Sequence, residues 1–423
     1  MRASGRGSDS VSITAATTPL RAREIFSAVS SILTVLAAMN IETPHLTPKP
    51  AFNIKLNDKT LTLLDERLIS LTHTDNRGFE ADTLELTLDD ADGALELPPR
   101  GAALSLALGW DQDPLIFKGI YTVDEITHSG PPDQLVITAR SADFRDTFNI
   151  KRDYSWHDIT VGTLITDIAS RYQLQAGVSD ELADITIDHA DQTSESDISF
   201  LTRIADQLGA VATVKNGTLL FILPGQGVSR SGKPLPVILI TRASGDGHHF
   251  NVADRDAYTG VTAYWLDLNF GKKKSTTIKS TKTTQSSYYN YHPKKTRAKT
   301  KKSKPAASSS KEGSYLAGAD GNVYTLKRTY KTETAAQRAA AAKWSQLQRG
   351  AASFSITLAR GRADLYPEQP AAVEGFKSTI DGKSWTITKC TNTVDGSGFR
   401  TALELEVKIS NDNAVSGGAD ASE

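Results

Sequence analysis

Two carboxylates flank a hydroxyl where Glu195, Ser196 and Asp197 follow one another. Paired carboxylates can act as general acid and base in a hydrolase, or bind a metal ion. Acids beside a serine can also cap a helix, because they accept hydrogen bonds from the free N–H groups of its first turn and complement the helix dipole. A helical pattern of apolar residues follows directly, so we favour capping and predict no catalytic residue here.

The other patterns that could carry chemistry are weaker. His248 and His249 precede Asp254 and Asp256, but adjacent residues of an extended chain point to opposite sides, and no HExxH spacing is present. Nucleophile-elbow and phosphate-loop motifs are missing. Cys390 is the only cysteine, which excludes an intramolecular disulfide. The sequence therefore predicts a protein that is not an enzyme and has no cofactor and no metal.

A basic segment is the least ordinary part of the composition. From Gly271 to Lys311 the chain is dominated by Lys, Ser, Thr and Ala, which cannot form a core. We predict a basic mobile insertion over residues 271–313 and favour a solvated loop. Contact with a polyanion stays open as an alternative, through Lys272, Lys273, Lys274, Lys294, Lys295, Arg297, Lys301 and Lys302.

Length and composition set the broad class. The chain has 423 residues, 39% hydrophobic and 23% charged, with a net charge of -1. This is typical of a globular protein of two or three domains, and it argues against a nucleic-acid partner. Near the N-terminus, basic residues precede an apolar run from Ile32 to Met39 that is too short to span a bilayer. We expect residues 1–48 to be a disordered extension, and Met39 is an alternative start of translation. We favour these interpretations over a secretory signal. We expect no membrane insertion.

The remaining elements predict a β-rich α+β fold with two antiparallel barrel-like domains and an inserted small helix-plus-hairpin subdomain. Residues 49–150 show period-two alternation and an Asn57-Asp58 turn, which favours the first barrel-like domain. Residues 151–225 contain two helices, one capped by Thr160 and the other starting at Ser194 or Ser196 and ending at Gly209, and then a hairpin at Asn216-Gly217.

Strands resume over residues 226–411, which we assign to the second barrel-like domain. An Ala-rich helix begins after Thr332 or Thr334 and stops at Gly350, and four strands follow it. Residues 412–423 are rich in Gly, Ser and Asp, so we expect a disordered tail.

The passage from Glu195 to Gly225 resembles the helix and hairpin of the phage late control protein D family. These are tail hub proteins of contractile-tailed phages, similar to the hub part of type VI secretion spike proteins. Residues 158–174 and 350–373 support the resemblance, which covers about Lys49 to Ser410. The long basic insertion and the residues before Met39 depart from the family. The residues that carry its signature in this sequence are Glu195, Ser196, Asp197, Phe200, Leu201, Arg203 and Gly209.

The resemblance implies a structural baseplate hub, in which a homotrimer of two-domain chains adapts the sixfold tail tube to the threefold central spike. Its implied partners are a tail tube protein or tube-proximal baseplate protein, a separate central spike protein and the tape-measure protein. It also implies assembly in the bacterial host cytoplasm and a place in the virion tail. Two alternatives from other classes are a tail-associated peptidoglycan hydrolase and a carbohydrate-binding adhesin.

Overall fold

The computed structural model describes residues 48–61, 64–141, 148–215, 217–229, 232–252, 258–267, 271–280, 322–408 and 414–419. The predicted N-terminal extension, including Met39, lies outside these residues apart from Pro48, and so does most of the basic insertion. Among the described residues, no helix combines the length and the apolar composition needed to cross a bilayer.

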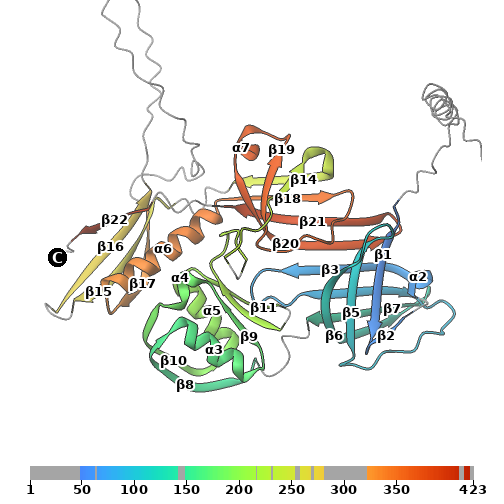
Figure 1. Ribbon diagram of the computed structural model, residues 1–423, viewed down its shortest axis with the longest axis horizontal. Coiled ribbons are helices and arrows are strands. Elements are labelled where there is room, and N and C mark those ends of the chain that lie inside the picture. The colour runs from blue at the N-terminus through green and yellow to red at the C-terminus, as the bar shows by residue number, and fades with distance from the viewer. Residues whose placement is uncertain are drawn as a thin grey trace, which may run out of the picture. The chain divides into compact units, whose positions relative to one another are not determined.

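Among its described residues, the first strand block contains seven strands and one short helix, and Figure 1 shows their arrangement. Alternate residues of its strands are buried in one core, as Leu84, Leu86 and Leu88 show, because side chains alternate between the faces of a sheet. The predicted turn is confirmed, since Asn57 and Asp58 both have positive φ. The alternation predicted beyond it is interrupted by the short helix. The elements are β1 (Pro50–Leu56), β2 (Lys59–Thr60), α2 (Leu64–Arg67), β3 (Leu68–Asn76), β4 (Thr83–Asp89), β5 (Ala103–Trp110), β6 (Ile116–Ser129) and β7 (Gln134–Ser141).

The second strand block has a core of its own, built around Phe354, Trp385 and Leu403. The four strands predicted after Gly350 are present, with a short helix between the second and the third. Its elements are β13 (Ile238–Thr241), η2 (Arg242–Ser244), β14 (Gly245–Val252), β18 (Ala352–Leu358), β19 (Pro370–Glu374), α7 (Ser378–Asp381), β20 (Ser384–Asp395) and β21 (Gly398–Val407).

One sheet of 13 strands runs through both blocks, in the order β14-β18-β21-β20-β3-β4-β7-β6-β5-β1-β2, with β13 and β19 branching from β20. The joint is the antiparallel ladder between β20 and β3, from Lys389 opposite Asn76 to Asp395 opposite Ser70. The predicted antiparallel, β-rich architecture is confirmed, with two parallel pairs among the described strands of the second predicted domain as exceptions: β13–β19, and the pair formed by residues 260–267 and 323–330. Within the described residues the strands do not close into barrels, because pairing continues from one block into the other and leaves both ends of the sheet open.

Between the blocks in sequence lies the helix-and-hairpin insert, with a separate core. Both predicted helices are confirmed: Thr160 Oγ1 accepts a hydrogen bond from the Thr163 amide, and Ser196 Oγ accepts one from the Ser199 amide. Gly209 ends the second helix in the left-handed conformation, with φ of 69°. The ladder β8–β10 and the parallel pair β9–β12 were not predicted. The elements are β8 (Lys151–Thr160), α3 (Val161–Arg171), β9 (Gln175–Val178), α4 (Asp180–Ala183), β10 (Thr186–Ser196), α5 (Asp197–Leu208), β11 (Val211–Lys215) and β12 (Thr218–Ile222).

A four-stranded sheet with one helix packed on it forms the remaining lobe. Helix α6 (Glu333–Arg349) starts after Thr332 and stops at Gly350, as predicted, and buries Ala336, Ala340 and Trp344 against the sheet. The strands are β15 (Gly260–Asp267), β16 (Lys272–Ser280), β17 (Val323–Tyr330) and β22 (Ala414–Ala419).

Two predictions are wrong in this lobe. Residues 272–280 belong to strand β16, paired along its length with β15, so they are not part of a mobile insertion. Residues 414–419 form β22 on the other edge of β16, although we expected a disordered tail. In both places the backbone supplies the reason, because the open edge of a strand can pair with an extended segment that has few apolar side chains.

Candidate functional site at the junction of three structural units

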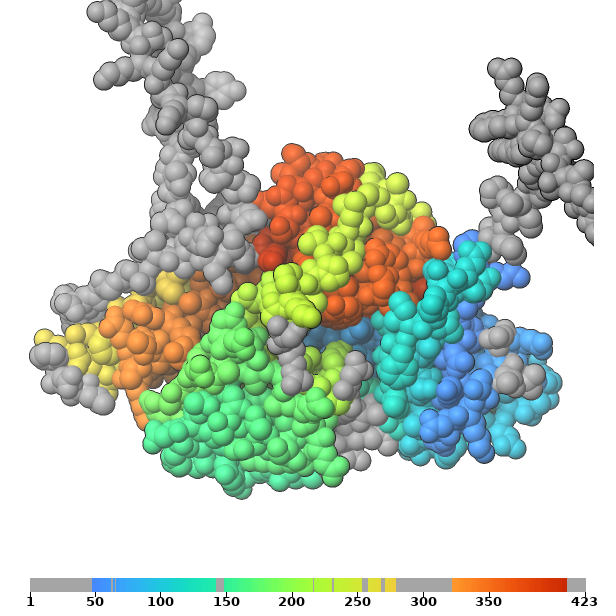
Figure 2. Space-filling view, viewed as in Figure 1, coloured from blue at the N-terminus to red at the C-terminus, as the bar shows by residue number. Residues whose placement is uncertain are grey.

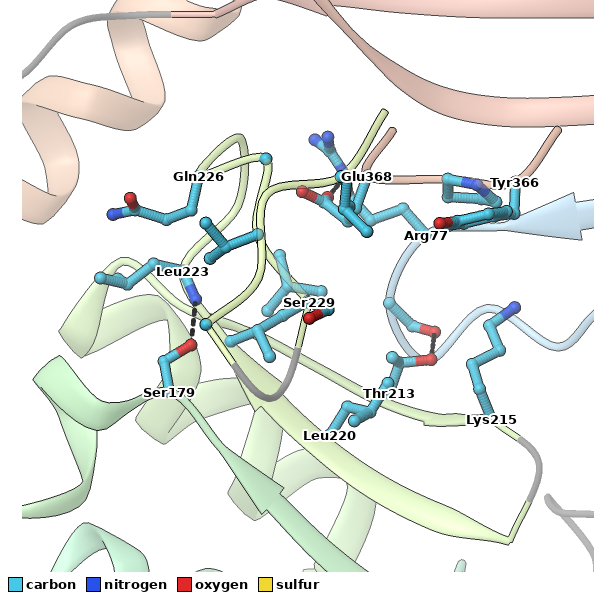
Figure 3. Close-up of a pocket in the computed structure, with 18 of the residues that line it drawn as sticks. Arg77, Ser179, Thr213, Lys215, Leu220, Leu223, Gln226, Ser229, Tyr366 and Glu368 are labelled. Carbon is cyan, nitrogen blue, oxygen red and sulfur yellow. Dashed lines mark hydrogen bonds and ion pairs between the residues drawn. The ribbon is translucent and has the colours of Figure 1, made fainter. Parts of the chain in front are cut away.

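Three parts of the chain meet around the turn between β3 and β4: this turn, the hairpin β11–β12 of the insert, and residues 366–368 of the second block. Together with residues 179–181, 223–229 and 232–235, they line an open cavity of about 390 Å³. Figure 3 shows Thr213 and Lys215 projecting from the hairpin toward the turn that carries Arg77, with Glu368 and Tyr366 entering from the second block. In Figure 2 the yellow-green segment that includes β13 crosses from the insert onto the second block, where β13 pairs with β19.

Lys215 is the centre of the first ionic cluster. Its Nζ lies 2.8 Å from Asp75 Oδ1 and 2.6 Å from Asp82 Oδ1, and it donates to the Asn76 carbonyl oxygen at 3.1 Å. Burial and the charge of Asp75 raise the pKa of Asp82 to about 6, against the pull of Lys215. Burial also works against the charged form of Lys215, but the two carboxylates outweigh it and raise its pKa. Asp82 and Lys215 are therefore charged at neutral pH, and the cluster fixes the hairpin of the insert to the first block.

A second ionic cluster joins the first block to the second. Arg77 Nε lies 2.5 Å from Glu368 Oε1, and Arg77 Nη1 donates to Glu406 Oε1 at 2.5 Å. Arg349, at the end of α6, lies 3.5 Å from the same Glu406 oxygen. Glu368 Oε2 also accepts a hydrogen bond of 2.7 Å from the Gly225 amide, at the exit of the insert. Two arginines and two glutamates balance in charge here, as buried ions require.

His73 lies in the ladder that joins the two blocks. Asn392 of β20 donates from Nδ2 to His73 Nδ1 at 3.3 Å, so we assign the ring proton to Nε2, which lies 2.6 Å from the Tyr121 hydroxyl. Tyr121 in turn donates to the Lys118 carbonyl oxygen. Burial, followed by the charges of Lys118 and Lys215, holds the pKa of His73 well below its usual range. The imidazole is therefore neutral and satisfied.

The predicted signature residues come together at the start of α5. Glu195 accepts two hydrogen bonds from Arg203, at 3.1 and 2.6 Å, and Arg203 also donates to the Asp191 carbonyl oxygen. Arg203 therefore joins α5 to β10 of the same chain. Ser196 caps the helix, as predicted, and Phe200 and Leu201 are buried in the insert core.

Asp197 has a larger role than the helix capping that we predicted for it. Its carboxylate is fully buried, 3.1 Å from Arg171 Nη1 and 3.3 Å from Arg152 Nε. Gln192 and the Tyr172 hydroxyl donate to it as well. Burial and the charge of Asp197 raise the pKa of Tyr172 to about 12. Because these partners come from β8, α3 and β10, Asp197 holds the insert together.

The residues of the other candidate sites are dispersed. Lys273 Nζ lies 4.1 Å from the centre of the Tyr264 ring, and Lys274 Nζ lies 3.0 Å from Asp267. Lys272 is the first residue of β16. The other predicted polyanion contacts, Lys294, Lys295, Arg297, Lys301 and Lys302, lie outside the described residues.

The predicted histidine cluster is only partly described. Asp254 and Asp256 lie outside the described residues, and His248 and His249 lie in strand β14. Among the residues described, no three His, Cys, Asp or Glu side chains are grouped to hold a metal. Cys390 is buried, which raises the pKa of its thiol.

Sequence reasoning missed the two ionic clusters. Lys215 is 133 residues from Asp82, and Arg77 is 329 residues from Glu406. Contacts at this separation leave no local pattern, so only the fold reveals them.

Comparisons with known proteins agree with this architecture. Residues 79–397 match the family model described as phage tail baseplate hub (GPD). The probable baseplate hub proteins of Escherichia phages 186 and P2 are 51% and 49% identical over 364 residues, which is 85% of this chain and 94% of each relative. The crystal structure of the 43 kDa tail protein of prophage MuSo2 from Shewanella oneidensis has the same fold, with a TM-score of 0.59 at 13% identity over 86% of this chain and 100% of that one. The resemblance found in the sequence is confirmed, and the chain belongs to the phage tail baseplate hub (GPD) family.

Proposed function

We propose that three copies of this chain form the ring of a baseplate hub, which adapts the sixfold tail tube to the threefold central spike. The observation that carries the proposal is the open sheet, in which two strand blocks with separate cores are joined by one ladder. Two blocks in each of three chains make six similar units on one side, while the chains themselves repeat three times. Such a ring presents both symmetries without a second polypeptide.

The ends of the sheet support a head-to-tail ring. Within the described residues, β14 pairs with β18 alone, and β1 pairs with β2 only at Lys55 and Leu56 on the edge away from β5. Free strand edges present unpaired N–H and C=O groups to another chain. An interface between two different surfaces closes into a ring when its rotation fits. In our proposal, β14 of one copy lies against β1 of the next.

The ionic junction suits this role. A ring closes only if each chain holds its two blocks at a fixed angle, because small errors add up around the circle. The contacts of Arg77 with Glu368 and Glu406, and of His73 with Asn392, cross between the blocks at buried positions. We infer that they set this angle.

The partners follow from the same geometry. We propose that one face of the ring binds a tail tube protein or tube-proximal baseplate protein, and that the other binds a separate central spike protein. The tape-measure protein is a third candidate, at the channel. In this proposal the chain assembles in the bacterial host cytoplasm, ends in the virion tail, and has a structural rather than a catalytic role.

Light scattering on the purified full chain tests the ring. We expect three times the 45.6 kDa chain mass. Val252→Lys, at a side chain of β14 that is 40% exposed, should weaken the assembly by placing a charge at the proposed edge contact. Leu97→Lys is the matched control, because Leu97 is 60% exposed outside any strand. A stable monomer at micromolar concentration, or equal effects of the two variants, would contradict the proposal.

A hydrolase assay tests the structural role separately. Zymography of the purified chain on cell wall should show no clearing. Clearing that disappears in the Glu195→Gln variant would instead assign catalysis to a carboxylate that we place in an ion pair with Arg203.

A further inference from the structure

Two histidines face each other on the outer side of the β8–β10 ladder. His157 of β8 lies directly opposite His189 of β10, and their Nδ1 atoms are 3.0 Å apart. The ring centroids are 4.7 Å apart, with 33° between the ring planes. The residues next to them, Trp156 and Ala190, point the other way into the core of the insert. The sheet therefore fixes both imidazoles while leaving them accessible to solvent.

A carboxylate orients one of the two rings. Asp191 Oδ2 lies 2.8 Å from His189 Nε2, and Asp191 Oδ1 accepts a hydrogen bond of 2.8 Å from the Ser155 hydroxyl. With its Nε2 proton directed to the carboxylate, a neutral His189 carries a lone pair on Nδ1, which faces His157. Histidines that bind metals are commonly oriented by a carboxylate on the second ring nitrogen in this way. Asp191 also brings a negative charge close to the place where a cation would lie.

We propose that His157 and His189 together bind one divalent transition-metal ion of the nickel, copper and zinc class, through both Nδ1 atoms. Neutral imidazole suits these metals. Two nitrogen ligands about 2.0–2.1 Å from a tetrahedral ion are separated by about 3.3 Å, close to the 3.0 Å between these Nδ1 atoms. Binding also requires both exposed rings to rotate, so that the Nδ1 lone pairs turn from each other toward the ion. Without metal, one Nδ1 proton bridges the two rings; on binding, His157 carries its proton on Nε2 instead. Water completes the coordination, since the site has two protein ligands.

This inference is independent of the proposed hub ring, because it concerns the outer face of the insert alone. The test is calorimetric titration of nickel chloride into the full chain, purified without a histidine tag. We expect one saturable site per chain. His157→Gln and His189→Gln should each weaken nickel binding at least tenfold, and Asp191→Asn about tenfold, because the latter only loosens the orientation of His189.

His249→Gln is the matched control. His249 is also an exposed strand histidine, but its neighbour His248 points to the opposite face of β14, so the two cannot chelate one ion. This variant should bind nickel as the unmodified chain does. Copper titration followed by electron paramagnetic resonance adds a second readout, with two coordinated nitrogens in the unmodified chain and one in each single variant.

The proposal fails if the unmodified chain shows no saturable nickel site, or if His249→Gln weakens binding as much as His157→Gln does. It also fails if the copper spectrum is unchanged in the His189→Gln variant. Thermal melting in EDTA confirms that each variant is folded, and His157→Asn replaces His157→Gln if the latter is not.

Discussion

Lys215 Nζ lies 2.6 Å from Asp82 Oδ1, and this contact fixes the insert to the first strand block. The neighbouring Asp75 approaches the same ammonium to 2.8 Å, so one cation lies between two carboxylates that are largely withdrawn from solvent. Lys215 therefore helps to hold the insert hairpin on the β3–β4 turn, beside the hydrogen bond that Thr213 Oγ1 donates to the Gly78 carbonyl oxygen.

Removing that cation should destabilise the protein. We expect Lys215→Met to lower the free energy of unfolding by about 2–3 kcal/mol, because two carboxylates would remain without a counter-ion. This is less than the loss for a fully buried pair, since the cluster is partly open to solvent. Lys59→Met, at an exposed lysine of β2, should change it by less than about 0.5 kcal/mol. Urea denaturation measures both. Adding Asp82→Asn to Lys215→Met should recover part of the loss, and a further loss would contradict this account.

Gly209 supports a second prediction, because two constraints meet at it. It has φ of +69°, and a Cβ there would lie 2.9 Å from Ala342 Cβ of α6. Gly217 has nearly the same φ, +70°, but no atom within 4 Å of such a Cβ. Gly217→Ala should therefore cost about 1 kcal/mol for the left-handed backbone alone. Gly209→Ala should cost about 1–3 kcal/mol more, because α5 and α6 must move apart.

Denaturation of the two glycine variants side by side isolates the contact between helices. Equal losses of stability would mean that α6 does not press on the end of α5.

These glycines also show how far sequence reasoning reaches. Gly209 was predicted to end α5 because a helix terminus is a local pattern, and the same holds for the caps Thr160, Ser196 and Thr332. The contact of Gly209 with Ala342 was out of reach, since it joins distant segments. The ladder between β3 and β20, which unites the two predicted blocks in one sheet, was missed for the same reason. Strand alternation specifies which face is buried, but not which strand lies alongside.

His73 predicts a dependence of stability on pH. Its pKa is held well below 6.5 in the folded protein by burial, whereas the unfolded chain takes up a proton near that value. At His73 the unfolded state then binds more protons below about pH 6.5, so the contribution of His73 to stability falls as the pH decreases from there. Asp82 contributes a slope of opposite sign, because its pKa is raised to about 6 in the folded protein and the folded state binds the extra proton there. Urea denaturation between pH 5 and 7.5 therefore measures the His73 contribution as the difference between the unmodified chain and His73→Gln. In that difference, stability of the unmodified chain should fall relative to His73→Gln as the pH decreases from about 6.5, and a constant difference would contradict this account.

Asp197 distinguishes a structural carboxylate from a catalytic one. It is fully buried, and Arg171, Arg152 and Gln192 surround it. Asp197→Asn leaves two arginines without their shared counter-charge, so we expect the free energy of unfolding to fall by about 2–4 kcal/mol. This loss is smaller than that expected for a fully buried ion pair, because both arginines reach solvent.

The matched control for Asp197 is Asp206→Asn, an exposed position on the same helix, which should change stability little. Thermal melting of both variants, beside zymography of each, separates the two roles. A variant that melts like the unmodified chain but loses activity on cell wall would make Asp197 catalytic. We expect instead that Asp197→Asn melts at a lower temperature, and that neither this variant nor the unmodified chain clears cell wall. That result places Asp197 in the structural core of the insert, where its ion pairs hold β8, α3 and β10 around the start of α5.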